Sequence, residues 1–144
     1  TLPDQYKAAI TGLPAWLAVL KPAASIETRA IFGSPLLVRD TEAVILAGFL
    51  ADTAGTLRRV LEGFGRNDLQ PPAEAHSADV ASASALLQRC FGNARMTGSG
   101  SAVFARAGTG AEPTAAMPAD LPPGWVGRMC RSLEQHPLVG WASE

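Results

Sequence analysis

The stretch at 93–105, which reads NARMTGSGSAVFA, contains the residues whose types and spacing could do chemistry. Thr97, Gly98, Ser99 and Gly100 combine two hydroxyl side chains with two glycines. Glycines let backbone N–H groups come close to an anion, and successive amides can form a concave anion site. The same glycines also permit the positive φ angles of a tight turn. The stretch alone therefore leaves both a phosphate-binding loop and a structural turn open.

The surroundings of the glycines exclude two common phosphate loops. A P-loop requires a Lys after its second glycine, whereas Ser101 follows Gly100. A dinucleotide loop leads from a strand into a helix, and the order expected here is helix, loop, strand. The loop then follows the negative end of a helix dipole, so an anion would depend on loop amides, on the Thr97 and Ser99 hydroxyls or on Arg95. Spacing alone favours the turn.

A few other polar residues could take part, each with an ordinary structural alternative. Thr28 either faces a ligand or bonds to the local backbone at the start of a helix. Asp68, before two prolines, is more typical of a cap, and Arg95 of a contact with helix carbonyls. His76 and His136 lack the spacing of metal ligands, and we interpret them as surface or turn residues.

Hydrophobic periodicity predicts the elements that hold the loop. Pro22 ends the apolar run at 16–20, because proline cannot donate to a strand ladder. Ser25 and Gly33 are expected to cap the two ends of a short helix. Apolar residues at helical spacing predict the longer helices. In chain order we expect a strand at 16–20, helices at 25–32, 40–49, 57–64 and 78–91, and strands at 101–107 and 125–130.

Two segments interrupt this pattern. The segment 67–72 breaks the helical register with its two prolines. Residues 108–123 are rich in Ala, Gly, Pro and Thr, show little periodicity, and are expected to form a mobile surface loop. With strands near the start, the middle and the end of the chain, the order of elements predicts an α+β domain.

Composition limits the classes of function. A chain of 144 residues, 47% of them hydrophobic, is long enough to bury the core of one domain. Its net charge of −1, from 12 basic and 13 acidic residues, argues against a nucleic-acid-binding surface and a polybasic membrane surface. No apolar run is long enough to cross a bilayer. Cys90 and Cys130 have no nearby partner ligands, which favours buried, reduced thiols and a cytoplasmic protein.

Five segments in the same order carry a resemblance. They are LPAWLAVLKPAASIETRAIF at 13–32, GSPLLVRDT at 33–41, NDL at 67–69, ARMTGSGSAVFA at 94–105 and HPL at 136–138. The fourth looks like the third motif of the small-molecule kinase family named for galactokinase, homoserine kinase, mevalonate kinase and phosphomevalonate kinase. Together the five are most similar to the branch that phosphorylates 4-diphosphocytidyl-2-C-methyl-D-erythritol in bacterial isoprenoid synthesis.

The resemblance implies that 13–144 is the C-terminal domain of such a kinase, with 1–12 as a lead-in from a missing N-terminal half and 108–123 as a flexible loop. It implies a ferredoxin-like two-layer α+β sandwich that closes an active-site cleft from one side. The implied reaction moves the γ-phosphoryl group of ATP, with Mg²⁺, to the 2-hydroxyl of that substrate in the non-mevalonate pathway. The residues expected to bind substrate or phosphate are Thr97, Gly98, Ser99, Gly100 and Thr28.

The sequence also departs from the family. The catalytic Asp and Lys and the ATP loop belong to the first half of these kinases, so Asp4 and Lys7 receive no such role and we expect the chain alone to lack kinase activity. The family usually has a helix where this chain has 108–123, and Asn and Ser where it has 134–136, so substrate contacts by the tail are not carried over. Two other classes stay open: a standalone ferredoxin-like module that binds a small molecule without catalysis, and an interaction domain whose proline-rich loop contacts a partner.

Overall fold

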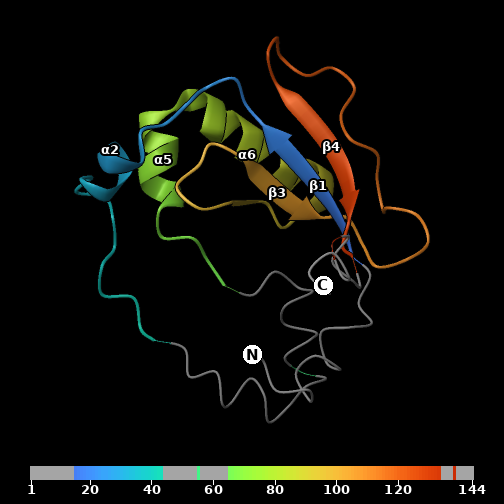
Figure 1. Cartoon of the computed structure of the whole chain (residues 1–144), viewed down its shortest axis with the longest axis horizontal. Helices are drawn as coiled ribbons and strands as arrows, with labels where there is room; N and C mark the ends of the chain where they lie inside the picture. The colour runs from blue at the N-terminus through green and yellow to red at the C-terminus, as the bar shows by residue number, and fades with distance from the viewer. Residues whose placement is uncertain (1–14, 44–54, 56–64, 134–137, 139–144) are drawn as a thin grey trace.

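The computed structural model describes residues 15–43, 55, 65–133 and 138. Within them, four antiparallel strands form one sheet in the order β2-β3-β1-β4, and helix α6 packs against one face (Figure 1). The α+β class predicted from the sequence is confirmed for this part of the chain. In chain order the elements are β1 (Trp16–Lys21), α2 (Thr28–Phe32), α5 (Gln70–His76), α6 (Ala78–Phe91), β2 (Arg95–Met96), β3 (Val103–Arg106) and β4 (Val126–Arg131).

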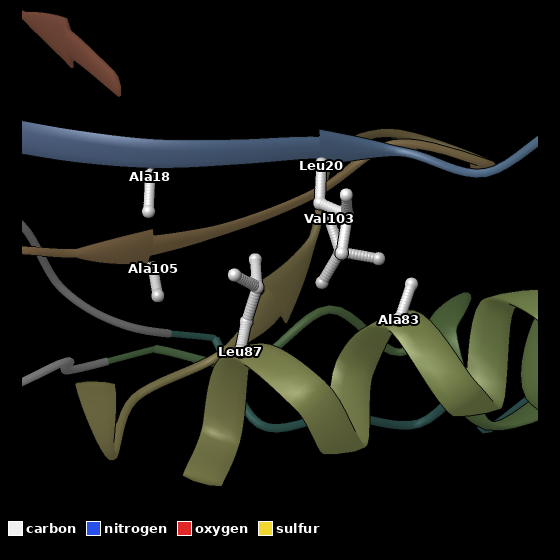
Figure 2. Close-up of a cluster of buried hydrophobic side chains, with 6 residues drawn as sticks. All are labelled: Ala18, Leu20, Ala83, Leu87, Val103 and Ala105. Carbon is white, nitrogen blue, oxygen red and sulfur yellow. The ribbon is translucent and has the colours of Figure 1, made fainter. Parts of the chain in front are cut away.

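The main core lies between α6 and the two central strands. Because side chains alternate along a strand, every second residue of β1 and β3 faces the helix. Ala18 pairs with Ala105 and Leu20 with Val103 in the β1–β3 register, and all four are fully buried. Small side chains on the strands allow close approach of the helix. Figure 2 shows the complete cluster, which consists of Ala18, Leu20, Ala83, Leu87, Val103 and Ala105.

Helix α6 begins and ends where the sequence predicts. The Ser77 side chain accepts a hydrogen bond from the Val80 amide at the N-terminus. At the C-terminus Gly92 has a φ of 79°, the left-handed conformation that glycine adopts at low cost. The two caps thus set the ends of the helix that packs on the sheet.

The prediction of buried thiols is wrong for both cysteines. Cys90 and Cys130 are free and exposed. On α6 the buried stripe continues from Leu87 to Phe91, four residues on, so Cys90 lies beside the stripe rather than on it. On β4 the inward position belongs to Met129, and its neighbour Cys130 therefore lies on the opposite face of the sheet.

Residues 107–125, all of which the structure describes, contain no helix or strand, as the sequence predicts for most of them. The segment nonetheless packs on the sheet. Met117 and Leu121 contact the main core, and a Cβ placed on Gly127 would lie 2.8 Å from Met117 and 2.9 Å from Leu121. Gly127 pairs with Leu20, so these side chains cover the same face as α6. The mobility expected for this segment stays a prediction.

The short elements differ most from the sequence-based expectations. Helix α2 begins after Glu27, with no side-chain cap, so Ser25 does not cap it. The sequence does not predict α5, because Pro71 and Pro72 resemble helix breakers. They lie instead in the first turn of α5, where proline has no N–H partner to lose. Strand β2 is also missed, since two residues are too few to show periodicity.

None of the described helices is long and apolar enough to cross a membrane.

Some predicted features lie outside the described residues. Residues 40–43 are described and contain no helix, so the helix expected at 40–49 does not begin at the predicted cap. The rest of that helix, the helix expected at 57–64, the lead-in at 1–12 and the tail at 134–137 with His136 lie outside the described residues.

Leu87→Ala should lower the free energy of unfolding by about 2–5 kcal/mol, because it removes a buried side chain from the centre of the core. Urea titration followed by circular dichroism measures the change. Leu133→Ala is the matched control: its side chain is 69% exposed, and the loss should stay below about 0.5 kcal/mol. Equal losses in both variants would contradict the assignment of the core to this face.

Candidate functional site

The glycine loop, defined as residues 97–100, is a tight turn between β2 and β3. The Thr97 amide donates to the Ala102 carbonyl at 2.9 Å, and the Gly100 amide donates to the Thr97 carbonyl at 3.1 Å. Gly98 and Gly100 have φ angles of 55° and 95°, which glycine adopts without a steric penalty. The structural turn that the spacing favours is therefore present, and the remaining question is whether the turn also binds a ligand.

The glycine loop presents polar backbone groups at the surface. Thr97, Gly98 and Gly100 are exposed, and Ser99 is half-buried. Within the part of the chain that the structure describes, the amides of Gly98 and Ser99 donate no hydrogen bond. Adjacent amides without internal acceptors are suited to the oxygens of an anion such as phosphate.

Thr28 and Ser99 meet although 71 residues separate them in the sequence. Their hydroxyl oxygens lie 2.9 Å apart at the surface, with Thr28 at the first position of α2. A hydroxyl has one proton and two lone pairs, so a bond between two hydroxyls uses one proton and leaves the other for a ligand. The structure thus brings together Thr28 and the glycine loop, which the sequence analysis selected separately.

Side chains that precede or begin α5 hold the base of the glycine loop. Because β2 is at the edge of the sheet, the backbone groups of Met96 that point away from β3 need other partners. Gln70 Oε1 accepts from the Met96 amide at 2.8 Å, and Asn67 Nδ2 donates to the Met96 carbonyl at 2.8 Å. Asn67 Nδ2 also donates to the Gly98 carbonyl at 2.7 Å.

The far side of the glycine loop is held by a buried serine and by apolar packing. Ser101 is only 3% exposed, and its hydroxyl donates to the Ala24 carbonyl at 2.6 Å. A Cβ on Gly100 would lie 3.0 Å from Met96 Sδ and 3.4 Å from Ile26 Cδ1, and this tight packing and the φ of 95° both favour glycine at this position. Ser101 thus ties the glycine loop to the segment between β1 and α2.

Sequence reasoning did not select the residues that anchor the glycine loop. Asn67 belongs to the NDL segment, whose similarity to the kinase family is the only signal that could have pointed to it. Gln70 and Ser101 carry no local signal, because their partners are far away in the sequence.

A groove of about 460 Å³ lies next to this region, and neither Thr28 nor the glycine loop lines it. Asp68, which does line it, forms an ion pair with Arg66 at 2.7 Å and accepts from Thr41. Asp68 is not the cap that the sequence favours, since Leu69 occupies the N-cap position of α5. In the groove, the charges of Arg66 and Asp68 therefore neutralise each other.

Arg95 and His76 form no hydrogen bond with the glycine loop among the bonds of the described residues. Arg95 is on β2 and lines the groove, and its expected contact with helix carbonyls stays a prediction. Burial, and then the positive charge of Arg95, lower the pKa of Arg106 on β3. His76 is exposed in the last turn of α5, in agreement with its interpretation as a surface residue.

The polar groups of the glycine loop are hydrogen-bond donors, which suit an anion, and not a cluster of metal ligands. Among residues 15–43, 55, 65–133 and 138, no three His, Cys, Asp or Glu side chains lie close enough to hold a metal ion. The available groups are the amides of Gly98 and Ser99 and the hydroxyls of Thr28, Thr97 and Ser99. Both amides, the Thr97 hydroxyl and one of the two hydroxyls of the Thr28–Ser99 pair can donate to phosphate oxygens at the same time.

Comparison with known proteins gives a consistent result. Residues 45–117 match the family model described as "GHMP kinases C terminal". The chain is 57% identical over 131 residues to a 4-diphosphocytidyl-2-C-methyl-D-erythritol kinase of Methylibium petroleiphilum, covering 90% of this chain and 43% of that protein.

Two other proteins of the same name extend the comparison. The kinase of Verminephrobacter eiseniae is 44% identical over 136 residues, which cover 91% of this chain and 45% of that protein. The kinase of Albidiferax ferrireducens is 44% identical over 124 residues, which cover 86% of this chain and 39% of that protein. The chain therefore spans less than half the length of each of these three relatives.

Ser101→Ala should lower the free energy of unfolding by about 1–2 kcal/mol, because it removes a buried hydroxyl and its bond to the Ala24 carbonyl. Ser99→Ala, two residues away, should cost less than about 0.5 kcal/mol, since its bond to Thr28 is exposed to water. Chemical unfolding of the two variants tests this difference. A larger loss for Ser99→Ala would show that the Ser99 hydroxyl is a structural group.

Proposed function

Because the chain belongs to the GHMP kinases, whose C-terminal family model matches half of it, we propose that it is the C-terminal domain of a 4-diphosphocytidyl-2-C-methyl-D-erythritol kinase. The complete protein would transfer the γ-phosphoryl group of ATP to the 2-hydroxyl of 4-diphosphocytidyl-2-C-methyl-D-erythritol, in non-mevalonate isoprenoid synthesis. The shared name of the relatives supports this substrate. A cytoplasmic location is part of the proposal.

The proposal includes a ferredoxin-like arrangement, a β-α-β-β-α-β unit with two helical crossovers. The antiparallel order β2-β3-β1-β4, with α6 in the connection between β1 and β2, supports it. The second crossover contains no helix, and 107–125 takes its place, with Met117 and Leu121 packed on the sheet. This segment would thus cover the sheet where the family usually has a helix.

One observation carries the proposed role of the site: the amides of Gly98 and Ser99, which donate no hydrogen bond within the described residues, lie beside the paired hydroxyls of Thr28 and Ser99. Phosphoryl transfer depends mainly on positioning and on stabilising the charge spread over phosphate oxygens. Amides and hydroxyls that are already fixed stabilise this charge without reorganising during the reaction. Apart from Gly98 and its two chain neighbours, no atom of the described residues lies within 4 Å of the place where a Cβ of Gly98 would be, which leaves room for a phosphate beside the backbone.

The described residues supply the anion-binding part of such a site and no metal-binding part. ATP would bring the phosphate that the glycine loop accepts. Mg²⁺, when bound with ATP, neutralises phosphate charge, but no cluster of ligands for it occurs in the described residues. The proposal therefore assigns phosphate binding to the Gly98 and Ser99 amides and orientation of the phosphate to Thr28 and Thr97.

In the complete protein, Gly98→Val should lower kcat/KM by about 10- to 1000-fold. The valine side chain would project into the open space beside the loop amides, and at a φ of 55° it would strain the turn. Release of ADP in the presence of 4-diphosphocytidyl-2-C-methyl-D-erythritol measures the reaction, and circular dichroism checks folding.

Gly92→Val is the matched control. Gly92 has a φ of 79° and, like Gly98, no described residue other than its chain neighbours within 4 Å of its Cβ position, but it precedes β2 whereas the glycine loop follows it. It should therefore be strained to a similar degree and keep its activity. If the unmodified protein releases no ADP with this substrate, the proposed function is wrong. If both variants lose activity equally, the glycine loop has no role in binding phosphate.

A further inference from the structure

We infer that Asn67 is a positioning residue that aims the Ser99 amide of the glycine loop at the phosphate, an inference that rests on the proposed function. The Asn67 side chain uses three of its four hydrogen-bonding positions. Its Nδ2 donates to the carbonyls of Met96 at 2.8 Å and Gly98 at 2.7 Å, and its Oδ1 accepts from the Leu69 amide at 3.0 Å. A single carboxamide thus connects the glycine loop to the start of α5.

The direction of the exposed amide follows from these bonds. In a trans peptide the carbonyl of one residue and the amide of the next point in opposite directions. Since the Gly98 carbonyl is held by Asn67, the Ser99 amide points away from Asn67. The same geometry at Met96 can be checked, because its carbonyl is held by Asn67 and the next amide, that of Thr97, donates in the other direction to Ala102.

The glycine loop needs this restraint because of its composition. Glycine has access to more backbone conformations than any other residue, so a loop with two glycines does not fix the direction of its own amides. The bond from Ser99 to Thr28 fixes a side chain, whereas the bonds from Asn67 fix the peptide group. Amides stabilise a transition state best when their directions are set in advance. Asn67 therefore acts through the glycine loop rather than on the substrate.

Asn93, which precedes β2, offers a matched control for Asn67. Its Nδ2 donates to the carbonyls of Phe91 at 3.1 Å and Arg106 at 3.2 Å, and its Oδ1 accepts from the Arg106 amide at 2.6 Å. Asn67 and Asn93 thus make the same kinds of bond. Asn67 lies at the end of β2 that leads into the glycine loop, and Asn93 lies at the other end.

The test compares Asn67→Asp with Asn93→Asp in the complete protein. Each change replaces a donor by a carboxylate that repels two carbonyl oxygens, so both should lower Tm. Only Asn67→Asp should lower kcat, by about 10- to 100-fold, because misplacing a catalytic group by about 1 Å costs rate of this order. The KM for the alcohol substrate should change less than about threefold, which corresponds to less than about 0.7 kcal/mol of binding free energy.

A pH profile separates positioning from simple destabilisation. When the carboxyl introduced by Asn67→Asp is protonated, its O–H can again donate to one of the two carbonyls. The activity of this variant relative to the unmodified protein should therefore rise as the pH is lowered from about 8 to about 6. Asn67→Ala cannot regain a donor, so its relative activity should stay constant over the same range.

Hydrogen exchange of the peptide at 95–101 gives a readout that does not require kinase activity. Exchange should accelerate in Asn67→Asp and stay unchanged in Asn93→Asp. If the unmodified protein shows no kinase activity but this difference in exchange is found, the proposed function fails and the positioning of the glycine loop by Asn67 stands. Equal losses of kcat in the two Asp variants, or unchanged exchange at 95–101 in Asn67→Asp, would overturn the inference.

Discussion

The site depends on how the outer backbone groups of one edge strand are satisfied. Strand β2 has only two residues and a neighbour on one side. A buried or half-buried backbone group without a partner is costly, so the Met96 amide and carbonyl require acceptors and donors from elsewhere. Gln70 and Asn67 supply them. The same bonds that close the edge of the sheet also determine where the glycine loop begins, which links the stability of the fold to the geometry of the site.

Two apolar clusters support this arrangement. The main core joins α6 to β1 and β3, and it fixes β3 as the strand on which β2 is built. The second cluster contains Ile31, Ala73, Val80 and Met96, which come from α2, α5, α6 and β2. Met96 takes part in both kinds of contact: its side chain is buried in the second cluster, and its backbone is held by polar side chains. The elements that carry Thr28, Asn67 and the glycine loop therefore pack on one another.

The comparisons and the geometry support each other from independent directions. Similarity to the GHMP kinases concerns residue identity along the chain. The contact between Thr28 and Ser99 and the exposed amides of the glycine loop concern positions in space. At 107–125 the sheet is covered without a helix or strand, because Met117 and Leu121 pack on the main core.

The sequence by itself determined the elements whose stabilising contacts are local or periodic. Helix α6 with its cap at Gly92, the three longer strands and the absence of regular structure at 108–123 follow from spacing and from the properties of Gly and Pro. The glycines at 98 and 100 predicted a turn for the same reason. Resemblance added the family, which periodicity alone does not contain.

Only the tertiary structure decided the features that depend on residues far apart in the chain. These features are the exposure of both cysteines, the helix that begins at Gln70, the hydrogen bond between Thr28 and Ser99, and the hydrogen bond from Asn67 to the glycine loop. A local pattern cannot specify them, because the partner of each group is chosen by packing over the whole domain. The sequence determined which residues could bind a phosphate, and the fold decided which of their backbone groups are free to do so.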